Sequence, residues 1–250
     1  MMSFTDDLHL IISQAGRPLA EAVVSLYQGG SSLLNGSTPQ SVEIGAESAS
    51  GEYALSNGGI LRLGISARAL DAPDALSVKW TFTNSGPTPV RFDRFEAPLL
   101  QLDRSAFPAQ APLWTLQGAA VTWGQDFAFE LPRGFARENF LGHEQNGEGG
   151  GIPVTYFWNK TRGLGLMHVE TSPKDWYMPV KSSKEGVTAG LELRKPVTLQ
   201  PGESFSSLEV VISVHTGDFF APLALYRDLL AEKGLKAPEP NTEDFAPAWC

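Results

Sequence analysis

The most constraining feature of the sequence is an alternation of apolar and polar residues with a period of two. Large apolar side chains stand at Leu76, Val78, Trp80 and Phe82, and Ser, Lys and Thr stand between them. Successive side chains of a β-strand point to opposite faces, so this pattern predicts a strand with one dry face. The segment 61–67 alternates in the same manner and predicts a second half-buried antiparallel strand.

Further segments extend this prediction to two packed sheets. In the segment 205–215, Leu208, Val210 and Ile212 share one face while Val211 adds apolar surface to the other, which predicts a central strand. The remaining strand candidates, separated by Gly, Pro, Asn and Asp clusters, are 7–13, 21–27, 88–94, 112–117, 152–159, 163–170 and 187–194. About ten strands without intervening helices predict an all-β fold, a large antiparallel β-sandwich. Trp114, Trp123 and Trp158 are expected to fill its core.

The periodicity changes after His215, where apolar residues recur at helical spacings. These residues are Pro222, Leu223, Tyr226, Leu229 and Leu230. Asp218 is a suitable N-cap and Gly234 stands where a residue just past a helix belongs. We therefore expect a sandwich domain over 1–216, a connecting helix over 217–235, and over 236–250 a proline-stiffened linker and the start of a further domain.

Charge and composition argue against several classes of partner. Nineteen basic and 28 acidic residues give a formal net charge of −9, which repels nucleic acid and anionic membrane surfaces. The lone cysteine, Cys250, permits no intrachain disulfide, and neither a secretory signal nor a long apolar run is visible. This predicts a cytoplasmic protein. The four histidines are scattered, so we expect no metal and no cofactor.

The apolar stretch 245–250 ends in Trp249 and Cys250. An exposed indole at a loose chain end would contribute little stability, so we expect this stretch to begin a strand of a missing domain. The alternative is that Trp249 packs back onto the sandwich.

The order of these elements resembles a known family. A sandwich, a helix carrying Leu225-Tyr226-Arg227-Asp228-Leu229-Leu230, a proline-bearing linker and Pro247-Ala248-Trp249-Cys250 resemble the approach to the catalytic barrel in family 36 glycoside hydrolases, the α-galactosidase and raffinose-synthase group. In that family a Trp-Cys-(Ser/Thr)-Trp segment forms the first barrel strand, and Trp249-Cys250 would be its first half. The stretches 151–160 and 163–170 are similar to paired strands of such sandwiches.

The resemblance implies the amino-terminal, mutarotase-like supersandwich of an enzyme whose (β/α)8 barrel this chain lacks. In the family, two barrel aspartates hydrolyse terminal α-galactosides with retention, one as nucleophile and one as acid and base. Both would lie beyond Cys250, so we expect the chain alone to be inactive. Its implied roles are to cap the barrel, to help recognise the α-galactoside and to contribute oligomer contacts.

Two stretches offer candidate sugar-binding residues. The polar, glycine-rich segment 142–151 should project from the sheets, and His143, Glu144 and Asn146 can exchange hydrogen bonds with sugar hydroxyls. Asp175 and Trp176 join a carboxylate to a ring that can stack on a pyranose. The alternatives are a solvated hairpin connection for the first stretch and, for the second, aromatic packing against the helix or a partner domain.

His168 and Glu170 stand two residues apart in a predicted strand and therefore share a face. Such a pair can transfer protons in a self-contained sugar isomerase of the mutarotase type, which is a second functional hypothesis. The alternative is a core or inter-domain histidine with a hydrogen-bond partner. A carbohydrate-binding or interaction module is the third hypothesis.

Overall fold

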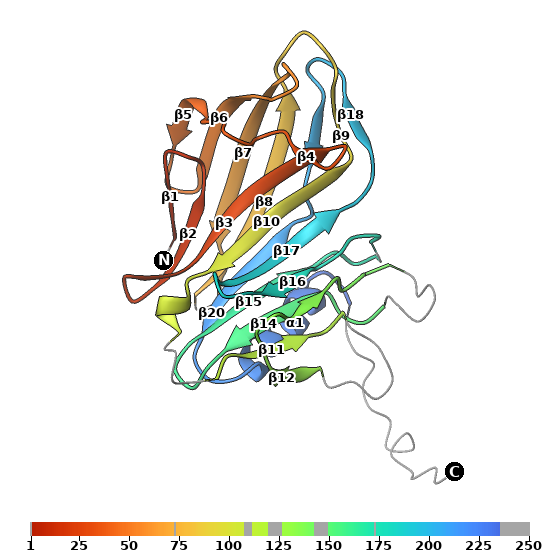
Figure 1. Ribbon diagram of the computed structural model, residues 1–250. Helices are drawn as coiled ribbons and strands as arrows, with labels where there is room; N and C mark the ends of the chain where they lie inside the picture. The colour runs from red at the N-terminus through yellow and green to blue at the C-terminus, as the bar shows by residue number, and fades with distance from the viewer. Residues whose placement is uncertain are drawn as a thin grey trace, which may run out of the picture.

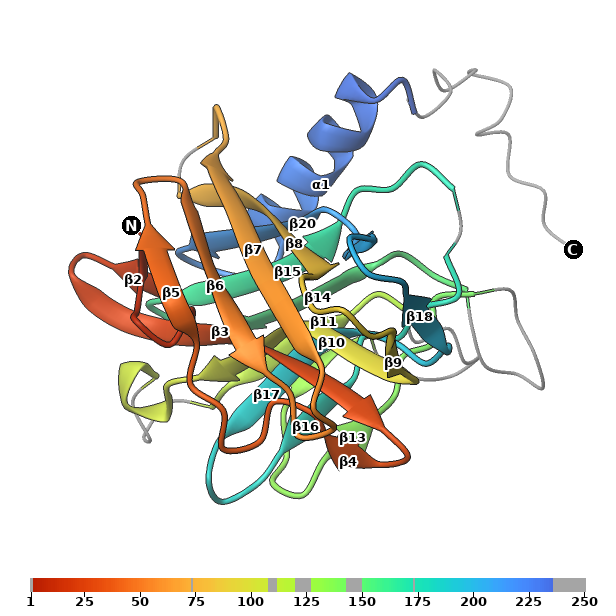
Figure 2. The same ribbon diagram turned by 90° about the horizontal axis from the view of Figure 1, so that it is seen from above.

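The structure, a computed structural model, describes residues 2–72, 74–107, 112–119, 127–142, 150–172 and 174–235. Two large antiparallel sheets pack face to face, and the helix α1 (Phe220–Glu232) lies on the outer side of one of them (Figure 1; Figure 2). The predicted large antiparallel β-sandwich, followed by one helix, is confirmed. Within the described residues no helix is long and apolar enough to cross a membrane.

The larger sheet has ten strands among the described residues. Their order is β12 (Ala128–Glu130), β11 (Trp114–Gln117), β14 (Val154–Trp158), β15 (Gly163–His168), β20 (Val210–His215), β8 (Ala75–Asn84), β7 (Ile60–Ala69), β6 (Ser48–Ala54) and β5 (Gln40–Ile44), and β19 (Ser204–Ser206) also pairs with β8. Because β20 lies between β15 and β8, the prediction of a central strand at this place is confirmed. The predicted strand 205–215 forms two strands, β19 and β20.

The second sheet has eight described strands. Their order is β1 (Met2–Phe4), β2 (Leu10–Gln14), β3 (Arg17–Gln28), β10 (Arg94–Leu102), β17 (Val187–Leu193), β16 (Val180–Ser182) and β13 (Ala136–Arg137), and β4 (Ser31–Ser32) also pairs with β3. β18 (Val197–Leu199) and β9 (Val90–Phe92) form a small separate pair, and a short 3-10 turn, η1, spans Arg104–Ala106.

The main hydrophobic core fills the space between the two sheets. Val78, Trp80 and Phe82 of β8 are fully buried there, as are Leu61 and Leu63 of β7. Burial of each large side chain contributes about 2–3 kcal/mol. A slip of one residue in the pairing would turn these side chains to the other face, so their burial fixes the register of the sheet. The apolar residues of the alternating pattern are thus the ones that form the contact between the two sheets.

A second hydrophobic cluster lies on the outer face of the ten-stranded sheet, beneath α1. Tyr156 of β14, Met167 of β15 and Tyr226 of α1 belong to it. The Tyr156 hydroxyl donates a hydrogen bond of 3.1 Å to the carbonyl of Pro222, which attaches the helix to the sheet. Every residue of β14 and β15 is buried, because these strands are covered on both faces.

The structure corrects two details of the sequence interpretation at the helix. Phe219, and not Asp218, occupies the N-cap position; Asp218 stands one residue further out, where its Oδ1 accepts the amide of Phe220 at 3.0 Å. Gly234 follows the C-cap with a φ of +88° and donates its amide to the carbonyl of Ala231, as expected for a left-handed helix end. Residues 236–250, with Trp249 and Cys250, lie outside the described residues.

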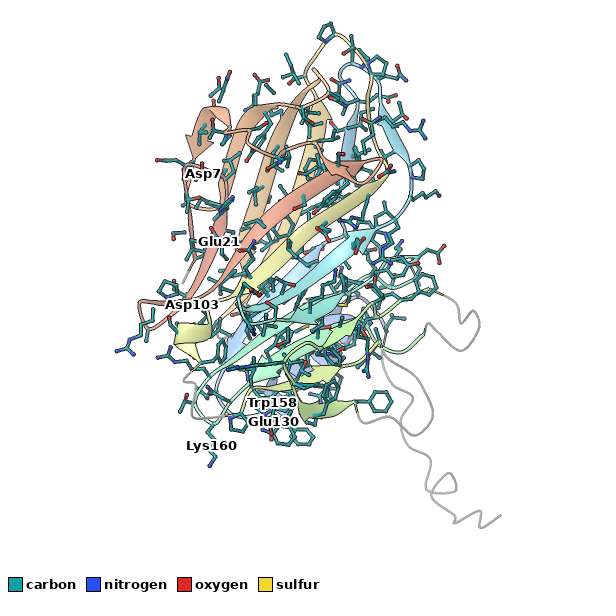
Figure 3. All side chains as sticks on the ribbon, in the orientation of Figure 1. Asp7, Glu21, Asp103, Glu130, Trp158 and Lys160 are labelled. Carbon is teal, nitrogen blue, oxygen red and sulfur yellow. The ribbon has the colours of Figure 1, made fainter. Side chains whose placement is uncertain are left out.

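The expected positions of the tryptophans also need correction. Trp114 is 39% exposed, and Trp158 is buried on the outer face of the ten-stranded sheet rather than between the sheets. The reason is the register, which sets Trp114 of β11 opposite Trp158 and next to Glu130 of the edge strand β12. Figure 3 labels Trp158 of β14 and Glu130 of the edge strand β12, which lie on either side of β11. Trp123 lies outside the described residues.

Candidate functional site

A cavity of about 280 Å³ opens where β15 ends beside α1. Polar side chains reach it from the segment after β15, and one phenol reaches it from the helix. These residues are His168, Glu170, Thr171, Ser172, Lys174 and Tyr226. Gly142 and Gly150 also line the cavity.

His168, the last residue of β15, is only 3% exposed. Its Nδ1 accepts the backbone amide of Glu170 at 3.3 Å, so the ring proton of the neutral imidazole belongs on Nε2. Burial, together with the nearby ammonium groups of Lys174 and Lys233, lowers the pKa of His168 to about 4. The imidazole is therefore neutral at pH 7. Its Nε2 is buried and has no hydrogen-bond partner among the described residues.

The other polar groups of the cavity balance one another in charge. The Lys174 ammonium lies 4.0 Å from the Glu170 carboxylate, and each side chain is about one third exposed. Tyr226 is buried, and this burial raises its pKa to about 12, so the phenol keeps its proton at neutral pH. The cavity thus offers hydrogen-bond donors and acceptors without a net charge.

This arrangement favours binding over proton transfer. A general base works best with a pKa near the operating pH, and the pKa of His168 lies well below 7. In the described part of the chain, no group of three or more His, Cys, Asp or Glu residues is placed to hold a metal ion.

The predicted sugar-binding residues fall in three places. His143, Glu144 and Asn146 lie outside the described residues. Asp175 is exposed, and its Oδ1 is so close to Gly142 that a Cβ at that glycine would approach it to 2.5 Å. It therefore lies beside the cavity rim.

Trp176 lies in the sandwich core, although it follows Asp175 directly. It is 7% exposed, and its ring packs edge to face against Phe95 of β10 with centroids 5.6 Å apart. Its indole therefore contributes to the contact between the layers.

His168 and Glu170 both line the cavity, but the prediction that they share a face of one strand is wrong, because β15 ends at His168 and Glu170 follows the strand. Sequence reasoning missed Lys174 and Tyr226. Lys174 carried no local signal, because a four-residue spacing indicates an ion pair only on a helix, and Glu170 and Lys174 do not lie on one. Tyr226 carried no such signal, because only the docking of α1 brings its ring to the end of β15.

A second polar region lies on the outer face of the eight-stranded sheet, which α1 does not cover. We call it the arginine–glutamate cluster; it comprises Arg94 and Glu96 of β10, Glu192 of β17 and the adjacent Arg194. Arg194 donates to both carboxylate oxygens of Glu192, at 2.8 and 3.0 Å. The guanidinium groups of Arg94 and Arg194 lie over the rings of Tyr27 and Tyr177, 3.8 and 4.0 Å from the centroids.

Comparison with known proteins gives a likeness of structure. No protein-family model matches the sequence, and no curated protein sequence matches it. The GH36 α-galactosidase AgaB from Geobacillus stearothermophilus matches over 91% of this chain and 31% of its own, with 16% identity and a TM-score of 0.50. The α-galactosidase from Lactobacillus brevis matches over 91% of this chain and 32% of its own, with 14% identity and a TM-score of 0.50.

The chain therefore spans about a third of the length of these two α-galactosidases. At these identities the likeness establishes the shared sandwich fold.

Proposed function

We propose that this chain is the non-catalytic, amino-terminal sandwich of an α-galactosidase-type glycoside hydrolase. In this role it caps a catalytic (β/α)8 barrel and helps to recognise the α-galactoside that the barrel cleaves. The observation that carries the proposal is the match of 91% of this chain to about a third of two α-galactosidases. Fold alone does not fix function, so the proposal needs a test at the level of the gene and of the reaction.

The first test reads the gene that encodes the chain. We expect the reading frame to continue past codon 250 into a barrel that begins with a Trp-Cys-(Ser/Thr)-Trp segment. The encoded protein should release galactose from a terminal α-galactoside and leave the matching β-galactoside intact, while the 250-residue chain should release none. A frame that stops at Cys250, or activity of the 250-residue chain itself, would contradict the proposal.

The proposal extends to the residues that meet the saccharide. His143, Glu144 and Asn146 belong to the segment whose ends, Gly142 and Gly150, line the cavity. We infer that these side chains, together with Asp175 at the rim, contact the bound galactoside. Replacing Asn146 by Ala in the encoded enzyme should raise KM several-fold and leave kcat nearly unchanged, as expected for a group that binds ground and transition state alike.

A sugar isomerase of the mutarotase type is the second candidate, because His168 and Glu170 share one cavity. The low pKa of His168 disfavours it, since the imidazole is a weak base at neutral pH. Polarimetry of freshly dissolved α-galactose separates the two candidates. We expect the uncatalysed rate in the presence of the chain; a faster rate that His168→Asn abolishes would support the isomerase.

A further inference from the structure

Two Asn-Gly pairs in the described part of the chain lie in exposed turns. Asn35-Gly36 lies between β4 and β5, and Asn57-Gly58 lies between β6 and β7. Both glycines have a positive φ, +71° and +83°, and nothing lies within 4 Å of the place where a Cβ would stand at either one. The two pairs therefore match in sequence, exposure and surrounding space.

Asn35 has no hydrogen-bond partner among the described residues. Its turn is closed by the amide of Ser37, which donates to the carbonyl of Leu34 at 3.1 Å, and the positive φ of Gly36 fits a type II turn. That bond uses neither the side chain of Asn35 nor the amide of Gly36. Both groups are therefore free to react with each other.

Asn57 and its glycine are instead held by three hydrogen bonds. The Nδ2 of Asn57 donates to Oε1 of Gln28 at 3.0 Å, and its Oδ1 accepts the amide of Gly59 at 3.1 Å. The amide of Gly58 donates to the carbonyl of Leu55 at 2.9 Å. Asparagine side chains commonly bond to the backbone of their own turn in this way. These bonds must open before the nitrogen of Gly58 can approach Cγ of Asn57.

We propose that Asn35 is a site of spontaneous covalent modification, where the side chain closes on the backbone nitrogen of Gly36 and water then gives aspartate or isoaspartate. Asn57 is protected from the same reaction by its hydrogen bonds. The inference goes beyond the proposed function and does not depend on it, because this turn carries none of the residues that contact the saccharide in that proposal.

The reaction needs only water, and its atoms and electrons balance. The amide nitrogen of Gly36 loses its proton to the solvent and attacks Cγ of Asn35; the N–Cγ bond forms, the Cγ–Nδ2 bond breaks, and ammonia leaves. Water then opens the cyclic imide at Cγ, which gives aspartate, or at the backbone carbonyl carbon, which gives isoaspartate. Asparagine is a thermolabile residue, and a glycine after it lets the backbone approach closely because it has no Cβ.

The products change the charge and the length of the turn. Either one puts a carboxylate where the amide stood, and isoaspartate also adds one methylene to the backbone. The Oγ of Ser37 donates to the carbonyl of Ala54 at 2.8 Å, and the amide of Ser56 donates to the carbonyl of Leu33 at 3.1 Å. These bonds hold the turn against the end of β6, so the modification alters the fit of this contact.

The experiment incubates the folded 250-residue chain in H₂¹⁸O at mildly alkaline pH and follows the two pairs by mass spectrometry after digestion in ordinary water. Cleavage after glutamate separates the pairs, because Glu43, Glu47 and Glu52 lie between Asn35 and Asn57. The isotope enters when water opens the imide, so it marks modification that took place during the incubation. We expect Asn35 to take up ¹⁸O at least about tenfold faster than Asn57, since two or more hydrogen bonds must open before Asn57 can react.

Two controls test whether the fold causes the difference. In the chain unfolded by urea, both asparagines should react at rates within a few-fold of each other, because the dipeptide is the same. In Gln28→Ala the Nδ2 of Asn57 loses its acceptor, so Asn57 should react several-fold faster while Asn35, which makes no bond to Gln28, keeps its rate. The circular dichroism of this variant should match that of the original chain.

Three outcomes overturn the inference. Equal rates at the two asparagines of the folded chain would mean that the bonds of Asn57 give no protection. A rate ratio that persists in urea would assign the difference to the neighbouring residues in the sequence. The absence of ¹⁸O at Asn35 after the unfolded chain has reacted fully would mean that the folded turn prevents the ring from closing.

Discussion

Two regions of the sandwich, the outer face of the eight-stranded sheet and the end of β15, differ in how their buried polar groups are paired. On the open face of the eight-stranded sheet, Glu192 is only 2% exposed, yet both its carboxylate oxygens receive hydrogen bonds from Arg194. At the end of β15, His168 is about as buried, and its Nε2 has no partner within the described residues. The buried charge of Glu192 is thus paired by a side chain, whereas, among these residues, the buried neutral ring of His168 is paired at Nδ1 alone.

The difference follows from the neighbours and the charge of each group. Neighbouring strands on an open sheet face place long side chains opposite one another, so arginines can reach carboxylates across the sheet. His168 stands opposite Val210, which belongs to the core between the sheets, so apolar side chains surround it on that face. A buried carboxylate needs a compensating charge, whereas a neutral imidazole does not.

The largest expected effect tests how much the pairing of Glu192 with Arg194 stabilises the fold. In Arg194→Ala, Glu192 would keep only the Nε of Arg94, at 3.5 Å, as a cationic neighbour within the described cluster. Removing one partner of a buried ion pair is strongly destabilising, so we expect a loss of about 3 kcal/mol in the free energy of unfolding. Urea denaturation at pH 7 measures it.

Arg227→Ala is the matched control for this prediction. Arg227 also pairs with a carboxylate, Asp228, but both side chains are more than half exposed. Exposed pairs contribute little, so this variant should lose no more than about 0.5 kcal/mol. A similar cost for the two variants would show that Glu192 gains nothing from its burial in the cluster.

The next largest effect tests the burial of His168 through the pH dependence of the free energy of unfolding. The pKa of His168 is lowered from 6.5 to about 4, so the unfolded chain takes up this proton at higher pH than the folded protein does. The contribution of the neutral imidazole to stability is complete above pH 6.5 and is lost as the pH falls toward 4. Between pH 6.5 and about pH 5 the loss should amount to about 2 kcal/mol.

His168→Gln removes this titration and keeps a polar group in place. The free energy of unfolding of the variant, measured in urea across the same pH range, should fall by about 2 kcal/mol less than that of the original chain. Identical pH dependence of the two proteins would mean that His168 titrates in the folded state as it does in the unfolded chain. That result would contradict the lowering of its pKa by burial.

The sequence predicted the parts of the fold that a local pattern determines. The alternation around Trp80 placed β7 and β8 and their dry faces, because burial on one side of a strand leaves a period of two. β10 was missed because Pro98 interrupts it, and a proline within an apolar run argues against a strand. The ladder accommodates Pro98 by a register shift between Glu96 and Leu99, which no local pattern reveals.

The same limit applies to the cavity. The spacing of His168 and Glu170 predicted one strand face, but β15 ends at His168, so Glu170 reaches the cavity from the segment after the strand. The place of Tyr226 depends on how α1 lies on the sheet, and that contact joins residues about 60 positions apart in the chain. The sequence therefore singled out two lining residues but not the helix residue beside them.

The smallest expected effect concerns Glu96, a buried carboxylate of the arginine–glutamate cluster that is less well paired than Glu192. It belongs to the paired cluster, directly opposite Glu192 across β10 and β17, but its only direct side-chain bond among the described residues is a long one of 3.4 Å from the Tyr27 hydroxyl. Burial raises the pKa of Glu96, and the charge of Glu192 raises it further. Its contribution to stability is therefore complete below pH 4.5 and is lost as the pH rises through the folded-state pKa.

Glu96→Gln removes the buried charge and keeps the shape of the side chain. At pH 7 we expect a gain of about 1 kcal/mol in the free energy of unfolding, because desolvation of a poorly paired carboxylate costs more than its neighbours return. The gain should vanish near pH 4, where the carboxyl is protonated in both states, so its pH dependence has the opposite sign to that of His168. If the variant is instead destabilised at pH 7, Arg94 and Lys181 compensate the charge of Glu96, and the outer face of the eight-stranded sheet then holds no poorly paired carboxylate at this place.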